Sequence, residues 1–457
     1  MKDTSLPESR VIPRSQHTVS RADIDREALK VMYRLRDEGF RAYLVGGGVR
    51  DLLLGKKPKD FDISTDAKPG ELRKIFRNSR IIGRRFRLVQ VFYAGGKIIE
   101  VSTFRCRSEF EINGGEIETL ASDNTYGDPA EDAFRRDLTI NALFYEIENF
   151  TVIDYTGGVE DLRRKLVRII GDPDRRLIRD PVRMLRAIRH AARADFSIEE
   201  ETWAAILRHV DKLGLCPDSR LRDELCKDLQ AGASRRWAEL ALASGIFFQL
   251  FPFYRGVLPQ PTPAEVESQS LTRPLGPLNE LLFKLLDILD RSVAAGAALS
   301  EEMIFGLLLL PWAESTLGLL NTEPDRAASY KLSRRLRGEL DQILVPLNIK
   351  KHVKESVAVL LANLPLLLAH DTPGGGGEDQ AQWPRWLTRK GYFPRCQAFH
   401  GLYRAALGEA ELPPIPEMVK SVKEAPALAE PRRRSSRSGG RRQGRAPAYA
   451  KKSIFGL

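Results

Sequence analysis

Two aspartates that lie two residues apart, Asp60 and Asp62, are the residues whose types and spacing first suggest chemistry. If both lie on a strand, their carboxylates project from the same face. Adjacent anions repel each other unless a cation lies between them. Carboxylate oxygens suit Mg²⁺, which completes its shell with water and substrate phosphates. Such pairs are often solvated turn residues, so the pair alone is weak evidence for a metal site. The residues that precede it provide further evidence.

Three glycines, Gly46-Gly47-Gly48, precede this pair and lie between a predicted strand, Arg41–Val45, and a predicted helix, Val49–Leu54. Glycines at such a turn let the backbone approach a phosphate closely, and a helix N-terminus favours anions. Arg50 adds a positive charge for the same phosphates. The alternative interpretation is a tight turn that needs glycine for a positive φ. Together with the aspartate pair, the turn predicts a triphosphate and metal site.

The elements that position these residues alternate between strands and helices as far as Asp161. Helical periodicity is clear in Ala22–Asp37, whose apolar residues share one face. The other expected elements are a strand at Lys59–Ser64, a helix at Glu71–Arg77, a hairpin of Leu88–Tyr93 and Ile98–Phe104, and a further strand or helix in Leu138–Ile147 and Thr151–Asp154.

From Pro181 onward the sequence pattern is almost entirely helical. The expected helices are Arg183–Arg193, Glu199–Val210, Arg220–Gln230 and Arg235–Ser244, with more from Leu278 to about His370. Thr372–Gln382 contains four consecutive glycines and is expected to be a flexible break. The fold class is therefore α+β, with a mixed β-sheet and its helices followed by an all-α region.

The composition is that of an ordinary soluble globular protein, with 42% hydrophobic and 29% charged residues in a chain of 457. No apolar run approaches the roughly 20 residues of a transmembrane helix, and the polar N-terminus does not resemble a secretory signal. The four cysteines are scattered, which argues against a disulfide framework or a zinc site. We therefore expect a cytoplasmic protein without a membrane span.

The net charge of +11 is distributed unevenly along the chain. Nine Lys or Arg residues and no acidic residue lie between Pro431 and Leu457, after a linker rich in Pro, Glu and Ala at Pro413–Glu430. Such a tail attracts polyanions without sequence preference, because binding releases counterions. A disordered solubility tail is the alternative. We favour nucleic-acid contact, with the candidate residues Arg432, Arg433, Arg434, Arg441 and Arg442.

Four motifs in order make the chain resemble the class II nucleotidyltransferases, the superfamily of bacterial poly(A) polymerases and tRNA CCA-adding enzymes. They are Leu44–Asp51, Asp60–Asp62, Arg135–Ala142 and Asp180–Ala187. The resemblance implies a small catalytic head followed by helical neck, body and tail regions. It also implies that Asp60 and Asp62 bind two catalytic Mg²⁺ ions and that ATP is the substrate.

The resemblance further assigns roles in the third motif. Asp137 matches an aspartate that is treated as catalytic in poly(A) polymerases of this type, and Arg136 is expected to contact the nucleotide. Glu100 is a rival third carboxylate, because it lies on a hairpin strand expected to pair near Asp60 and Asp62. An ion pair between Asp137 and Arg135 or Arg136 is the structural alternative. We favour Asp137 on the family match.

Asp180 and Arg183 stand at i and i+3 near a helix start, which is also the spacing of an ordinary surface ion pair. The resemblance implies that they read the incoming base. A carboxylate accepts from an exocyclic amino group while a guanidinium donates to a ring nitrogen, a pattern that adenine and cytosine both offer. Guanine and uracil present the opposite polarity. Arg186 is a further candidate contact, and Arg179 replaces a residue that is commonly acidic in the family.

Three features favour a poly(A) polymerase over a CCA-adding enzyme. The Gly83–Leu88 segment, the N-terminal Ile12–His17 segment and the basic tail all resemble the bacterial poly(A) polymerases. The expected domains are an N-terminal extension (1–40), a catalytic head (41–165), a helical neck (166–245), a helical body (246–412) and a linker with a basic tail (413–457).

The function expected from these features is template-independent addition of AMP to RNA 3′ ends. A CCA-adding enzyme is the first alternative. A catalytically silent RNA-binding protein of the same fold is the second, although both metal aspartates and the Arg135-Arg136-Asp137 block are retained. RNA 3′ ends and ATP are the expected partners, the chain is expected to be a monomer, and RNA-decay or RNA-chaperone proteins remain open as further partners.

Overall fold

The computed structural model describes residues 9–83, 87–106, 126–271, 276–371 and 383–413 of the chain. The chain divides into two units, residues 1–419 and 420–457, and every described residue lies in the first. The predictions for Thr372–Gln382, for residues 414–430 of the linker Pro413–Glu430 and for the basic tail therefore lie outside the described residues, as do residues 84–86 of the Gly83–Leu88 segment.

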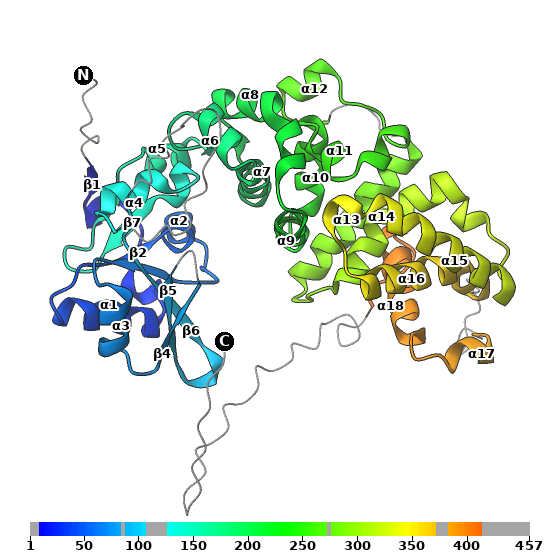
Figure 1. Ribbon diagram of the computed structural model, residues 1–457, viewed down its shortest axis with the longest axis horizontal. Coiled ribbons are helices and arrows are strands. Elements are labelled where there is room, and N and C mark those ends of the chain that lie inside the picture. The colour runs from blue at the N-terminus through cyan, green and yellow to red at the C-terminus, as the bar shows by residue number, and fades with distance from the viewer. Residues whose placement is uncertain (1–8, 84–86, 107–125, 272–275, 372–382, 414–457) are drawn as a thin grey trace, which may run out of the picture. The chain divides into compact units, whose positions relative to one another are not determined.

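An eight-stranded mixed sheet forms the N-terminal part, in the order β1-β8-β7-β2-β3-β6-β5-β4 (Figure 1). The strands are β1 (Arg10–Ile12), β2 (Ala42–Val45), β3 (Asp62–Thr65), β4 (Ser79–Ile82), β5 (Leu88–Phe92), β6 (Ile98–Thr103), β7 (Leu143–Glu146) and β8 (Val152–Asp154). β1 pairs with β8, so residues 10–12 belong to the same sheet as the rest of the N-terminal part.

The register of β2 and β3 brings the two candidate motifs together. These strands are antiparallel and pair Val45 with Asp62. The chain therefore leaves β2 into the glycine turn beside the point where it enters β3. On its other side β3 pairs in parallel with β6, with Ile63 opposite Val101. Glu100 on β6 consequently lies at the same end of the sheet as Asp62.

The helices of this part are α1 (Arg26–Asp37), α2 (Gly47–Leu53), α3 (Pro69–Ile75), α4 (Pro129–Arg135) and α5 (Gly158–Arg163). α1 begins at Arg26 because Asp25 caps it, accepting hydrogen bonds from the N–H groups of Glu27 and Ala28. Its buried residues Val31, Met32 and Leu35 recur on one face, as the periodicity predicted.

The rest of the described chain is helical apart from a two-stranded pairing of β9 (Leu166–Val167) with β10 (Ser197–Ile198). Its helices are α6 (Pro173–Arg179), α7 (Val182–Ala194), α8 (Glu200–His209), α9 (Asp218–Leu229), α10 (Ser234–Ala243), α11 (Ile246–Leu250), α12 (Pro263–Glu267), α13 (Pro277–Ala294), α14 (Glu301–Leu317), α15 (Arg326–Ile343), α16 (Lys351–His370), α17 (Arg385–Thr388) and α18 (Phe393–Leu407). The expected α+β class is confirmed.

Most expected elements are confirmed, including the β5–β6 hairpin and helices α7 to α10. One detail of the candidate site was wrong: β3 begins at Asp62, so Asp60 lies in the irregular segment before the strand. The pattern did not predict β1 and β4, which contain only three and four residues. α16 is long and apolar enough to cross a membrane, but 61% of that stretch is buried inside the structure, as in a core helix.

Candidate active site

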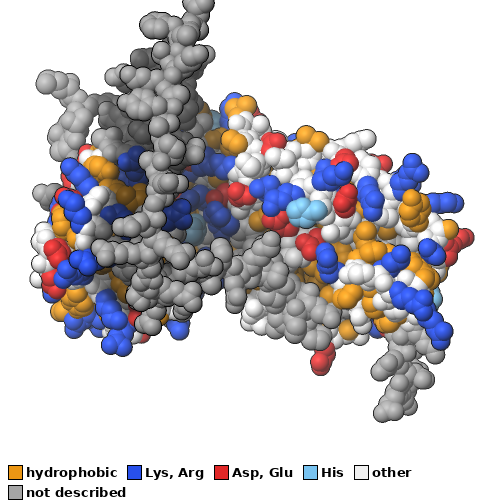
Figure 2. Space-filling model, turned by 60° about the horizontal axis from the view of Figure 1, so that its bottom comes forward, with side chains coloured by type: hydrophobic (Ala, Val, Ile, Leu, Met, Phe, Trp, Pro, Cys, Tyr) orange, Lys and Arg blue, Asp and Glu red, His pale blue; other side chains and the backbone are white. Residues whose placement is uncertain are grey.

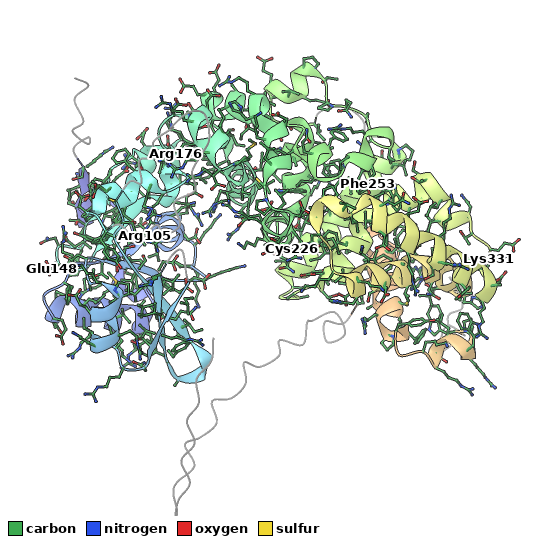
Figure 3. The ribbon with its side chains drawn as sticks, viewed as in Figure 1. Arg105, Glu148, Arg176, Cys226, Phe253 and Lys331 are labelled. Atoms are coloured by element: carbon green, nitrogen blue, oxygen red, sulfur yellow. The ribbon has the colours of Figure 1, made fainter. Side chains whose placement is uncertain are left out.

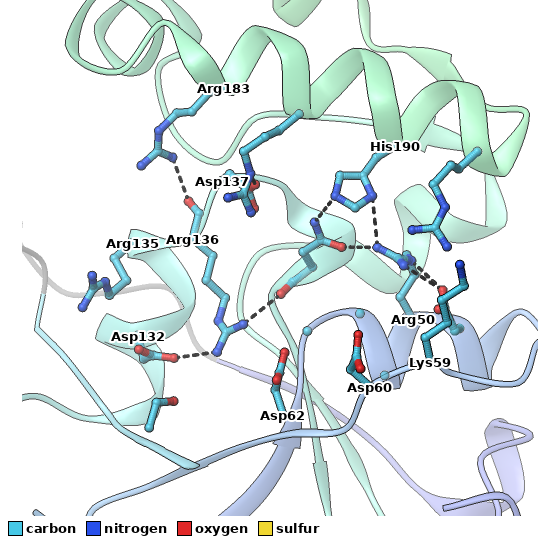
Figure 4. Close-up of a pocket in the computed structure, with 18 of the residues that line it drawn as sticks. Arg50, Lys59, Asp60, Asp62, Asp132, Arg135, Arg136, Asp137, Arg183 and His190 are labelled. Carbon is cyan, nitrogen blue, oxygen red and sulfur yellow. Dashed lines mark hydrogen bonds and ion pairs between the residues drawn. The ribbon is translucent and has the colours of Figure 1, made fainter. Parts of the chain in front are cut away.

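The glycine turn, the paired aspartates and the start of α7 open onto one pocket of about 540 Å³ (Figure 4). Its walls are strongly charged, with eight Lys or Arg side chains and six Asp side chains among the residues that line it. The predicted residues in its lining are Gly46, Gly47, Arg50, Asp60, Asp62, Arg136, Asp137, Asp180, Arg183 and Arg186. All the site residues predicted in the described part of the chain therefore share one pocket.

The glycine turn is shaped by conformation and by close packing. Gly46 has φ 70° and ψ −132°, a region that residues with a side chain rarely adopt. A Cβ on Gly46 would lie 3.1 Å from Nη1 of Arg136, and one on Gly48 would lie 3.4 Å from the backbone oxygen of Asp60. The first N–H groups of α2, which starts at Gly47, have no partner within the helix and are available to an anion.

The carboxylates of Asp60 and Asp62 both face the pocket (Figure 4). Burial and, after it, the negative charge of Glu100 raise the pKa of Asp62 from 3.8 to about 6; Arg136 opposes this rise, and Asp60 adds a smaller contribution to it. The side chain is nevertheless accessible to solvent within the pocket. A carboxyl group with a raised pKa beside two other acids is a site that a cation would stabilise.

A metal ion fits this donor set. Asp60 and Asp62 are hard oxygen ligands beside an open volume, and Mg²⁺ is commonly bound by one or two carboxylates together with phosphates and water. Among the described residues no group of three or more His, Cys, Asp or Glu side chains is arranged to hold a metal ion by itself. Substrate phosphates and water would complete the coordination of a metal held by these two carboxylates.

Arg50 is held beneath the glycine turn and is only 7% exposed. Its Nε and Nη2 donate to Oδ1 of Asp51 at 2.9 and 2.7 Å, and its Nη1 donates to Oδ1 of Asn141 at 2.6 Å. Nη1 also lies 3.2 Å from Nδ1 of His190 on α7. Burial, followed by the charge of Arg50, holds the pKa of His190 well below its usual value, so this ring is neutral. Arg50 thus joins α2 to α7.

Asp137 forms an ion pair with Arg186 and with neither of its sequence neighbours. Nε of Arg186 lies 2.5 Å from Oδ2 of Asp137, which is 8% exposed, and Oδ1 accepts from the N–H of Leu138. Burial alone would raise the pKa of Asp137, but the charge of Arg186, with a smaller contribution from Arg183, lowers it well below its usual range. Asp137 is therefore an ionised carboxylate that already has a cationic partner.

Arg136 bridges the sheet and the pocket. Its Nη2 donates to Oδ2 of Asp132 at 2.9 Å, and its Nη1 donates to the backbone oxygen of Asn141 at 3.3 Å. The guanidinium also lies over the ring of Phe144, 5.4 Å from its centroid. The buried Nε has no hydrogen-bond partner. These contacts fix the direction of the Arg136 guanidinium at the wall of the pocket.

Asp180 forms ion pairs with arginine side chains from two helices. Nε of Arg183 lies 3.5 Å from its Oδ2, as the i, i+3 spacing predicted. Arg220 on α9 adds a two-pronged contact, with Nη1 at 2.8 Å from Oδ1 and Nη2 at 3.0 Å from Oδ2. Nη1 of Arg183 donates to the backbone oxygen of Arg136 at 3.3 Å, which ties α7 to the motif that carries Asp137.

Several pocket residues were not predicted: Lys59, Ser102, Arg105, Asp132, Asn141, His190 and Arg193. Two of these residues, His190 and Arg193, could have been predicted from the sequence. They follow Arg183 and Arg186 at helical spacing on α7 and therefore share a face with them. Glu224 on α9 forms an ion pair with Arg189 of α7 at 2.6 Å. The predicted tail contacts, Arg432 to Arg434 and Arg441 and Arg442, lie outside the described residues.

Two segments of the chain match known protein families. Residues 42–168 match the family of the Poly A polymerase head domain, and residues 195–256 match the "Probable RNA and SrmB-binding site of polymerase A". The chain is 50% identical over 252 residues to Poly(A) polymerase I of Escherichia coli O157:H7, covering 54% of each chain. It is 38% identical over 205 residues to a CCA-adding enzyme of Lactobacillus helveticus, covering 45% of this chain and 50% of that one.

The chain spans about half the length of the curated relatives it matches. Among solved structures, the CCA-adding enzyme of Bacillus stearothermophilus in complex with CTP is similar, with a TM-score of 0.56 and 23% identity. That likeness covers 84% of this chain and 78% of the other. At this identity it supports the fold, an α+β head followed by helices.

Proposed function

We propose that this chain, whose residues 42–168 form a poly(A) polymerase head domain, is a template-independent nucleotidyltransferase that adds AMP from ATP to RNA 3′ ends. The observation that carries the proposal is the single pocket in which the Asp60 and Asp62 carboxylates, the glycine turn and the Asp180–Arg183 pair meet. These three features supply a metal site, a phosphate site and a base site for one nucleotide.

In this mechanism the nucleotide is held at both ends. Its triphosphate lies on the glycine turn and near Arg136, and its base lies against Asp180 and Arg183. Mg²⁺ ions held by Asp60 and Asp62 would lower the pKa of the RNA 3′-hydroxyl and stabilise charge on the departing pyrophosphate. The hydroxyl oxygen attacks the α-phosphorus, the bond to the bridging oxygen breaks, and RNA is extended by one AMP. The protein contributes mainly positioning and electrostatics.

The roles of Arg50 and Asp137 need refinement within this proposal. Arg50 uses three of its five N–H groups on Asp51 and Asn141, so its main role is to hold the glycine turn, with remaining N–H capacity for a phosphate. Asp137 fixes Arg186 beside the nucleotide site. Glu100, whose negative charge raises the pKa of Asp62, is the rival for the third carboxylate, whereas the family pattern favours Asp137.

The choice of ATP over CTP rests on similarity as much as on geometry. A carboxylate and a guanidinium side by side select adenine and cytosine over guanine and uracil, but they do not separate the first two. The identity of 50% to a poly(A) polymerase, against 38% to a CCA-adding enzyme, supports adenine. A CCA-adding activity is therefore the second candidate function. We place the activity in the cytoplasm, with RNA as the partner.

The test uses the purified full chain, Mg²⁺, each nucleoside triphosphate in turn, and two acceptors: a generic single-stranded RNA and a tRNA trimmed of its 3′ end. Long tails made from ATP alone on the generic RNA would support the proposal. Addition of two C residues to the tRNA from CTP alone, followed by a single A when ATP is also supplied, would instead identify a CCA-adding enzyme. We expect Asp62→Asn to abolish transfer while Asp37→Asn, an exposed carboxylate on α1, leaves it unchanged. Transfer that is absent from the parent as well would favour an RNA-binding protein without catalysis.

A further inference from the structure

Helix α15 has one buried face and one face that is exposed and strongly cationic. Leu332, Leu336 and Leu340 are buried, and the helix packs against α16 (Figure 1). Arg326–Ile343 contains five Lys or Arg residues and two acidic residues, and none of the five cations is buried. Because its apolar face is already covered, the polar face is free to meet a partner.

The exposed residues of α15 form a continuous row. Arg326, Tyr330, Arg334 and Arg337 follow one another at the i, i+4, i+8 and i+11 positions, which lie on one side of a helix. Lys331 and Arg335 form a second row beside the first. Figure 3 shows the Lys331 side chain pointing away from the helix toward solvent. The row extends about 16 Å along the helix axis, which spans several phosphates of a nucleic-acid strand.

These cations differ from ordinary surface charges, because acidic residues do not neutralise them. Within the part of the chain that the structure describes, Lys331, Arg334, Arg335 and Arg337 form no ion pair. The acidic residues of α15 lie beyond the last cation, and one of them, Asp341, already binds Lys354. On α1, by contrast, Arg34 pairs with Glu38 and Arg36 with Asp37. Adjacent cations without counter-charges repel one another, and a polyanion would relieve that repulsion.

Two aromatic side chains near these cations indicate which kind of polyanion would bind. Tyr330 is 70% exposed in the middle of the cationic row, although tyrosine usually buries part of its ring. The guanidinium of Arg326 lies over the Trp386 ring, 5.4 Å from its centroid, which fixes that charge at one end of the row. An aromatic ring among cations is the pattern that stacks an unpaired base while the backbone is held, as proteins do with single-stranded RNA.

We propose that this α15 face, made of Arg326, Tyr330, Lys331, Arg334, Arg335 and Arg337, binds single-stranded RNA. It lies outside residues 195–256, the segment that matches the RNA-binding family, and none of its residues lines the catalytic pocket. The cations contact phosphates and Tyr330 stacks on one base. The choice of RNA as partner rests on the proposed function, and the face would hold RNA at a distance from the reacting 3′ end.

The first test removes three cations, Arg334→Ala, Arg335→Ala and Arg337→Ala, from the full chain. The control removes three exposed cations from α1, Lys30→Ala, Arg34→Ala and Arg36→Ala, and changes the net charge equally. Binding of a fluorescent oligo(A) is measured by anisotropy over a range of salt. Each lost phosphate contact lowers the slope of log affinity against log salt concentration by about 0.7. The slope of the α15 variant should therefore fall by about 2, and the slope of the control should stay close to that of the parent.

The second test separates base stacking from charge. Tyr330→Ala should weaken oligo(A) binding roughly tenfold at unchanged salt slope, because stacking does not depend on counterions. Tyr330→Phe should restore the affinity, since a phenyl ring stacks as well. In AMP transfer to a long RNA, the α15 variants should raise KM for RNA and leave kcat at saturating RNA unchanged.

Equal affinities and salt slopes for the α15 variant, the α1 control and the parent would overturn the inference. Loss of affinity for polyglutamate with unchanged RNA binding would also overturn it and would indicate an acidic protein as the partner. These outcomes are independent of catalysis, since binding is measured without ATP. A parent that binds RNA through α15 but transfers no AMP would refute the proposed function alone.

Discussion

The raised pKa of Asp62 predicts how its replacement by asparagine changes stability. A carboxyl group whose pKa is higher in the folded than in the unfolded chain destabilises the folded state wherever it is ionised in that state. The rise from 3.8 to about 6 is about two units, equivalent to about 3 kcal/mol. Because Asp62 is accessible to solvent within the pocket, screening reduces this penalty to about 1–2 kcal/mol.

Asp62→Asn should therefore increase the free energy of unfolding by about 1–2 kcal/mol at pH 8 in the absence of divalent cations, with little gain near pH 4. The measurement is urea unfolding across that pH range, with Asp37→Asn as the control. Mg²⁺ should reverse the order at pH 8, because it binds the parent and not the variant. A gain that is the same at pH 4 and pH 8 would refute the electrostatic reasoning.

The same pKa predicts how Mg²⁺ affinity depends on pH. A bound cation must displace the proton of Asp62, so the apparent dissociation constant of Mg²⁺ should rise about tenfold for each pH unit below about 6 and level off above it. Calorimetric titration of the parent at several pH values measures this. Equal affinity at pH 5 and pH 8 would show that Asp62 is not the titrating ligand.

Three further predictions concern neighbouring residues. Arg186→Met leaves the buried charge of Asp137 without its main partner and should cost about 2–3 kcal/mol in urea unfolding, since Arg186 is partly exposed; adding Asp137→Asn should recover most of that loss, and no recovery would contradict the pairing. Gly46→Ala should cost about 1–3 kcal/mol and raise KM for ATP, because Gly46 has φ 70° and closely approaches Arg136; an unchanged variant would show that the turn does not need glycine. Asp180→Asn can donate to the carbonyl oxygen of uracil or guanine as well as accept from the amino group of adenine or cytosine, so discrimination against UTP and GTP should fall; retained selectivity would exclude Asp180 from base reading.

Local sequence determined the parts of the site that depend on nearby residues. The glycine run after Arg41–Val45 predicted the turn because only glycine readily adopts the backbone angles of Gly46. The alternation of Leu88–Phe104 predicted the β5–β6 hairpin, and apolar spacing predicted the buried face of α1. These signals are read over a few residues, so no tertiary contact is needed to interpret them.

Only the tertiary structure decided which charges meet. The partner of Asp137 is Arg186, 49 residues away, and Asp180 is held by Arg220, 40 residues away. The pairing of β1 with β8 could not be predicted from the sequence either, because a strand as short as β1 contains too few residues to show a periodic pattern. Residue types and spacing in the sequence therefore predicted a metal and phosphate site. The ionisation and direction of each side chain depend on burial and on distant charges, and only folding fixes these.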